Sequence, residues 1–136
     1  MLSVSNLTTS YGLIKALNAV SLVAKEGQVT CILGPNGAGK TTLMFTLAGI
    51  LKPASGSVKF DGIEIAGLGA PKVLQRGLSL VPENRLVFPL MSVRDNLMAG
   101  AYLRPKSKRN EVENDLEKLY ERFPVLEQRF RLHSTG

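Results

Sequence analysis

The sequence lacks the features that mark secreted and membrane-spanning proteins. Its single cysteine, Cys31, cannot form a disulfide within the chain. Because this cysteine sits in an apolar run, we expect a small buried residue rather than a nucleophile, in keeping with a reducing cytoplasm. The first residues carry no basic stretch followed by an apolar one, so no secretory signal is visible. No apolar window approaches the roughly 18 residues that a membrane span requires, so a place at a membrane would have to come through a partner.

Acidic residues are fewer than basic ones, with 11 Asp and Glu against 17 Lys and Arg and a formal net charge of +6. An excess of basic residues is typical of proteins that bind nucleic acid or an anionic membrane surface, so both are partners to consider. The one dense basic run, residues 104–109 (RPKSKR), has no aromatic residues interleaved for base stacking. A solvated loop explains that run better, and we expect no nucleic-acid partner.

Residues 34–42 read GPNGAGKTT and fit the phosphate-loop pattern G-x-x-x-x-G-K-[ST]. The preceding run 29–33 (VTCIL) predicts a buried strand, and the following residues predict a helix, which is the context that such a loop needs. The pattern therefore predicts nucleoside triphosphate binding by residues that include Gly34, Pro35, Asn36, Gly37, Ala38, Gly39, Lys40, Thr41 and Thr42.

The chemistry of a triphosphate explains these residue types. Gly34, Gly37 and Gly39 allow backbone N–H groups to converge on a phosphate, and the N-terminus of the next helix adds partial positive charge. Lys40 supplies a compact full charge for the β- and γ-phosphates. The hydroxyl of Thr41 can bind the Mg²⁺ that bridges those phosphates.

Period-2 patterns at residues 2–7 and 20–23 predict strands ahead of the loop. Tyr11 lies between them and could stack on the nucleotide base, or it could be an ordinary aromatic at a strand end. Asp61 and Gly62 predict the turn of a hairpin. Residues 71–76 predict a short helix and residues 78–81 a short buried strand.

Glu83 follows that last strand. Ligands gather at the carboxyl ends of parallel strands, so this carboxylate is a candidate contact for metal or water, the alternative being a solvated loop residue. Beyond it, Ser92 resembles a helix cap and predicts a helix to about Leu103, and Asn110 opens another in the same way. Apolar residues recur at helical spacing in the second helix and predict core packing. They are Val112, Leu116, Leu119, Tyr120 and Phe123.

With these residues described, the chain resembles the first part of an ATP-binding-cassette (ABC) ATPase subunit. The resemblance covers essentially the whole chain, in order: Tyr11 at the place of the adenine-stacking aromatic, GPNGAGKTT as the Walker A loop, the SGSVKFDG hairpin, and residues 80–83 at the Q-loop. It implies an α/β P-loop NTPase fold with an N-terminal antiparallel β layer, a parallel core sheet and the start of a helical subdomain. It also implies a nucleotide-binding core over residues 1–86, a helical part over residues 87–136, and ATP and Mg²⁺ as ligands.

One departure from the family pattern points to a subfamily. Glu83 stands where most ABC ATPases carry Gln, which contacts Mg²⁺ and the attacking water and relays movement to the membrane partner. A carboxylate keeps the acceptor role toward the metal, so the resemblance assigns catalysis to Lys40 and Glu83 and the metal to Thr41 and Glu83. The stretch VPENRLVFPLMSVRDNLMAGAYLR resembles the smaller ATPase subunit of branched-chain amino-acid importers, although Asn84 stands where relatives often have Gly.

Several family motifs have no counterpart in the sequence. It has no LSGG signature and no apolar run ending in Asp-Glu, and its one histidine, His133, is misplaced for the switch role. We therefore expect an N-terminal fragment that binds ATP weakly and does not turn it over, because phosphoryl transfer needs carboxylates that hold Mg²⁺ and orient water.

The resemblance also implies partners and a place in the cell. It implies membrane permease subunits, a second ATP-binding subunit that forms a dimer, and indirectly a periplasmic or extracellular solute-binding protein. The place would be the cytoplasmic face of the inner or plasma membrane, through the permease. The alternatives are a non-transport ABC ATPase that acts on nucleic acid or ribosomes and, more remotely, a kinase or GTPase.

Overall fold

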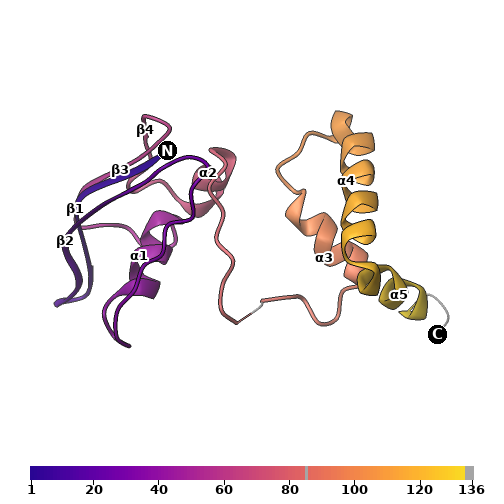
Figure 1. Ribbon diagram of the computed structural model, residues 1–136, viewed down its shortest axis with the longest axis horizontal. Helices are drawn as coiled ribbons and strands as arrows, with labels where there is room; N and C mark the ends of the chain where they lie inside the picture. Colours follow the sequence, from indigo (N-terminus) through magenta and orange to yellow (C-terminus); the bar gives the residue numbers. More distant parts are fainter. Residues whose placement is uncertain (85, 134–136) are drawn as a thin grey trace. The chain divides into compact units, whose positions relative to one another are not determined.

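The computed structural model describes residues 1–84 and 86–133, and it divides into two units, Met1–Val81 and Pro82–Gly136 (Figure 1). The first unit is a β-sheet with two helices, and the regular elements described in the second unit are all helical. Within the described ranges, none of the helices combines the length and the apolar character that a bilayer crossing requires.

The sheet of the first unit contains strands β1 (Leu2–Tyr11), β2 (Ile14–Ala24), β3 (Ser55–Phe60) and β4 (Ile63–Glu64) in the order β2-β1-β3-β4, and all pairs are antiparallel. The strands predicted ahead of the loop are thus confirmed. Asp61 and Gly62 join β3 to β4 with φ angles of 48° and 80°, the left-handed geometry that a tight hairpin turn requires. The predicted hairpin is therefore confirmed as well.

Helices α1 (Lys40–Leu47) and α2 (Ala70–Gln75) pack their apolar side chains on the sheet. Leu7 is fully buried and Val73 is 1% exposed, so both the sheet and α2 contribute to one core. The other buried members of this core are Val4, Leu17, Leu43, Leu47, Val58 and Ile65. Removal of this apolar area from water is what holds the two helices on the sheet.

Two predicted strands differ from the structure. Residues 29–33 and 78–81 are irregular, and Val29, Leu33 and Val81 are each at least 90% exposed. Cys31 is exposed too, so the expectation that it is buried was wrong. A strand exists through hydrogen bonds to a neighbouring strand, and in the part of the chain that the structure describes neither segment has one. The antiparallel β layer and the P-loop helix of the expected fold are in place, but the described residues form no parallel core sheet, because these two segments are unpaired.

The second unit contains helix α3 (Val93–Gly100), a 3-10 turn η1 (Lys106–Lys108), and helices α4 (Arg109–Arg122) and α5 (Pro124–His133). Ser92 is the N-cap of α3 and its hydroxyl accepts a hydrogen bond from the backbone N–H of Asp95, which confirms the predicted cap. Arg94 donates two hydrogen bonds to Glu113 of α4, at 2.6 and 2.8 Å, and these hold the pKa of Glu113 below its ordinary value.

Three details of this unit correct the sequence prediction. Helix α3 ends at Gly100 rather than near Leu103. Helix α4 begins one residue before Asn110, and in the described structure no side chain caps it. Of the predicted apolar stripe only Val112 and Leu116 are buried, because the two neighbouring helices of the unit cover only part of that face.

Candidate nucleotide site

The predicted phosphate loop leads directly into helix α1 (Figure 1). Gly37 and Gly39 have φ angles of 84° and 87°, which L-residues with a Cβ rarely adopt. A hydrogen bond of 3.2 Å from the Ala38 N–H to the Pro35 carbonyl closes the turn. The backbone thus curls in the way that brings successive N–H groups to one side.

Lys40 reaches back over this loop. Its ammonium Nζ donates hydrogen bonds to the carbonyls of Gly34 at 2.7 Å and Pro35 at 2.8 Å. Residues 33–38 are all exposed, so the charge is held at the surface of the loop and not inside the core. A phosphate oxygen that entered the loop would meet a cation already placed at its rim.

Gly39 is the point at which the loop touches the sheet. A Cβ at this position would lie 2.6 Å from the carbonyl oxygen of Ala16 and 2.9 Å from a methyl group of Leu17, both in β2. Real Cβ contacts do not come so close, so only glycine lets the helix begin there. The conformation of the loop and its place against β2 thus depend on the same residue.

The N-terminus of α1 is suited to an anion. Its first N–H groups have no partner within the helix, and in the described structure no side chain caps it and no acidic residue lies in its first turn. The residues present therefore fit a phosphate group, through N–H groups, helix dipole and ammonium together.

Thr41 and Thr42 follow Lys40 but face different surroundings. Thr41 is exposed, so its hydroxyl is accessible to a metal ion. Thr42 is only 8% exposed, and its side chain belongs to the core. Its role in ATP binding stays a prediction, now for its backbone N–H and not for its buried side chain. Among the residues described, no three His, Cys, Asp or Glu side chains cluster, so a metal here would depend on Thr41 and on phosphate oxygens.

Tyr11 ends strand β1 and is 50% exposed. It pairs with Ile14 at the tip of the β1–β2 hairpin. Because Gly39 abuts Ala16, two positions further along β2, this tip lies at the end of the sheet that carries the phosphate loop. The structure thus brings together the predicted aromatic and the predicted phosphate site within one unit.

Glu83 does not belong to the first unit, which contains the phosphate loop. It lies in an exposed turn directly after Pro82, which begins the second unit. Its roles toward metal and water stay predictions. The resemblance to the family also predicts that residues 85–102 form the surface that faces a permease, and the first of these, Arg85, lies outside the described residues.

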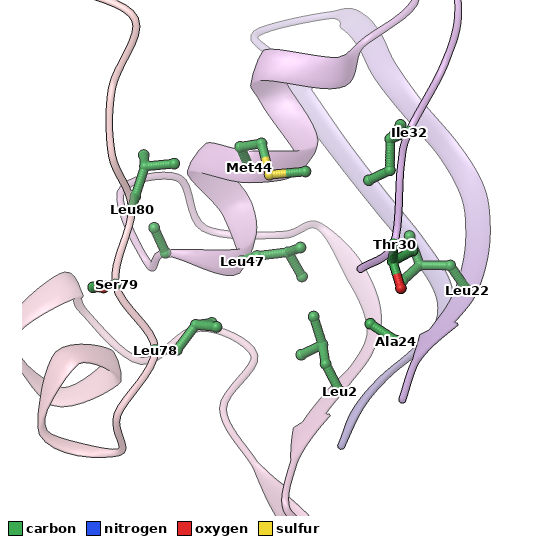
Figure 2. Close-up of a pocket in the computed structure, with 11 residues that line it drawn as sticks. Leu2, Leu22, Ala24, Thr30, Ile32, Met44, Leu47, Leu78, Ser79 and Leu80 are labelled. Atoms are coloured by element: carbon green, nitrogen blue, oxygen red, sulfur yellow. The ribbon is translucent and has the colours of Figure 1, made fainter. Parts of the chain in front are cut away.

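The structure adds a feature that the sequence patterns did not indicate. An apolar groove of about 180 Å³ lies in the first unit (Figure 2). Side chains of α1, of strands β1 and β2, and of two extended segments that are far apart in the sequence line it, so no local period could have revealed it. The lining residues are Leu2, Leu22, Ala24, Thr30, Ile32, Met44, Leu47, Ala48, Leu78, Ser79 and Leu80.

Comparison with known proteins gives consistent matches. Residues 17–134 match the family model described as ABC transporter. The chain is 38% identical over 130 residues to the high-affinity branched-chain amino acid transport ATP-binding protein BraG of Pseudomonas aeruginosa, covering 96% of this chain and 54% of BraG. It is 32% identical over 124 residues to the lipopolysaccharide export system ATP-binding protein LptB of Escherichia coli, covering 91% of this chain and 52% of LptB.

A solved structure agrees with these matches. The structure of an ATP-binding cassette dimer in a post-hydrolysis state, bound to ADP and Pi, matches with a TM-score of 0.71 and 27% identity. That match covers 86% of this chain and 55% of the cassette. The chain spans about half the length of the relatives it matches.

Proposed function

Given that the chain belongs to the ABC transporter family, we propose that it binds Mg²⁺-ATP as part of a transport ATPase subunit. The observation that supports this most directly is the loop at α1, where Lys40 lies over the carbonyls of Gly34 and Pro35 beside the helix N-terminus. In this proposal Lys40 contacts the β- and γ-phosphates, Thr41 binds Mg²⁺ and Tyr11 stacks on adenine. Glu83 would add a metal and water contact in the assembled subunit.

Removal of the Lys40 charge tests the proposal. We expect Lys40→Ala to weaken Mg²⁺-ATP binding about 10- to 100-fold, because a charged hydrogen-bonding group is lost. The measurement is a titration with a fluorescent ATP analogue, with unlabelled ATP as competitor. Lys25→Ala is the matched control, since Lys25 is an exposed lysine in the turn after β2. Equal affinity in the two variants would contradict the proposed site.

The solute that we propose is a branched-chain amino acid. The support is the 38% identity to BraG, whose name assigns it to branched-chain amino acid transport, together with the importer character of residues 81–104. LptB, also a relative, is named for lipopolysaccharide export, so the assignment requires its own test. Cells that carry Lys40→Ala should lose uptake of labelled leucine, isoleucine and valine. Unchanged uptake of all three would reject this solute class.

The proposal includes the assembly that the family uses. A second ATP-binding subunit and membrane permease subunits would complete the transporter on the cytoplasmic face of the membrane, with a solute-binding protein on the other side. The matched cassette was solved as a dimer, which supports the first of these partners. The expectation that these 136 residues bind ATP without turning it over stays a prediction, and phosphate release by the purified chain would contradict it.

A further inference from the structure

Three threonines form a buried polar chain between strand β1 and helix α1. The hydroxyls of Thr9 and Thr46 are 3.1 Å apart, and the Thr46 hydroxyl donates a hydrogen bond of 2.8 Å to the carbonyl of Thr42. Because that bond uses the one hydroxyl hydrogen of Thr46, Thr9 is the donor to Thr46. Thr9, Thr42 and Thr46 are 1%, 8% and 4% exposed, so water does not compete for these bonds.

This pair is an exception among its surroundings. Apart from Thr42, the other buried residues described in this core are aliphatic, so valine would fill either position with nearly the same shape. A hydrogen-bonded pair of hydroxyls at this place restricts how strand β1 and helix α1 lie relative to each other, because the bond has good geometry in only one arrangement of the two.

Thr9 lies at an irregular place in strand β1. The ladder between β1 and β2 is irregular on both sides of this residue, between Leu7 and Thr9 and again between Thr9 and Ser10. Bulged strands bend, so the register of the pairs up to Leu7 does not continue to Ser10 and Tyr11, although both still pair with β2. Tyr11 is the last residue of that end.

The other end of the pair is tied to the phosphate loop. The carbonyl that accepts from Thr46 belongs to Thr42, which adjoins Thr41 in the first turn of α1. We infer that Thr9 and Thr46 are positioning residues that fix the distance between the aromatic end of β1 and the phosphate site at α1. This inference rests on the proposed ATP site. It predicts that Thr9 and Thr46, by placing Tyr11, make the site bind a nucleotide more tightly than a triphosphate without a base.

The test separates positioning from stability. Thr46→Val leaves the buried Thr9 hydroxyl without its acceptor, whereas in Thr9→Val the Thr46 hydroxyl keeps its bond to the Thr42 carbonyl. Thr46→Val should therefore lower stability more than Thr9→Val, and Thr9→Val added to Thr46→Val should restore much of the loss. Stability is measured by urea unfolding of the 136-residue chain. Binding of Mg²⁺-ATP and of Mg²⁺-tripolyphosphate is measured by calorimetry, and the ratio of the two affinities reports base contact.

In the double valine variant we expect this ratio to fall about three- to tenfold while tripolyphosphate binding is kept. Tyr11→Ala should lower the ratio in the same way. The double serine variant, Thr9→Ser with Thr46→Ser, keeps both hydroxyls and should keep the wild-type ratio. Thr30→Val is the matched control because Thr30 is exposed.

The outcomes distinguish this inference from the proposed function. A folded double valine variant with the wild-type ratio would overturn the inference and leave the ATP site intact. A double valine variant that cannot fold would overturn it as well, because the hydroxyls would then support folding and not position. A wild-type chain that binds neither ligand would instead contradict the proposed function, and one that binds both equally would reject base contact at Tyr11 and the inference with it.

Discussion

At the scale of single residues, the glycines of the loop differ in what they tolerate. Gly39 and Gly37 share a left-handed backbone, but a Cβ on Gly39 would meet the Ala16 carbonyl at 2.6 Å, whereas a Cβ on Gly37 would meet nothing within 4 Å. Gly39→Ala should therefore cost about 1 kcal/mol more in free energy of unfolding than Gly37→Ala, which carries only backbone strain of about 1–2 kcal/mol.

Urea unfolding of the two variants checks this difference, with nucleotide titration alongside. Gly39→Ala should also weaken Mg²⁺-ATP binding, because the start of α1 must move away from β2. Two variants of equal stability would show that the close approach of Gly39 to β2 is not needed.

At the scale of elements, the short strand β4 depends on a carboxylate. Glu64 accepts hydrogen bonds from the N–H groups of Val58 at 2.8 Å and Ala66 at 3.0 Å, and from the Ser57 hydroxyl. Burial acts to raise the pKa of Glu64, but these hydrogen bonds and the charge of Lys59 outweigh it and hold that pKa below its ordinary value. A two-residue strand has few ladder bonds of its own, so this carboxylate adds to its attachment, beside the buried side chain of Ile65.

A lowered pKa in the folded state fixes the sign of the pH dependence. The stabilisation by Glu64 is present above its unfolded pKa and is lost as the pH falls through the lower folded value. Glu64→Gln should cost only about 0.5 kcal/mol at neutral pH because the site is exposed, and it should flatten the loss of stability in acid. Urea midpoints from pH 7 down to pH 3 measure this, with Glu26→Gln as the control. An equally steep acid loss in Glu64→Gln would contradict the role.

At the scale of the whole molecule, exposed apolar side chains lie on two segments of the first unit that have no paired neighbour in the described structure. Val29 and Val81 are 94% and 90% exposed, each on an extended segment without a paired neighbour in the described structure, and the segments line the apolar groove (Figure 2). Unpaired backbone beside apolar surface favours association between chains.

Val29→Lys combined with Val81→Lys should reduce self-association while changing the free energy of unfolding by no more than about 0.5 kcal/mol. Light scattering over a range of protein concentrations measures the effect. Leu13→Lys with Leu90→Lys is the control, since both leucines are fully exposed and lie outside these segments. Equal reduction by the two pairs would mean that added charge alone is responsible.

The sequence by itself determined the features that a few adjacent residues decide. The glycines and lysine of GPNGAGKTT set the loop before α1, Asp61 and Gly62 set the hairpin turn, and Ser92 capped α3. The tertiary structure decided whatever depends on distant partners. Residues 29–33 remain unpaired and Cys31 exposed, because a strand is made by its neighbours. Thr9 meets Thr46 only because β1 packs on α1, and a buried hydroxyl bond between distant residues leaves no local pattern in a sequence.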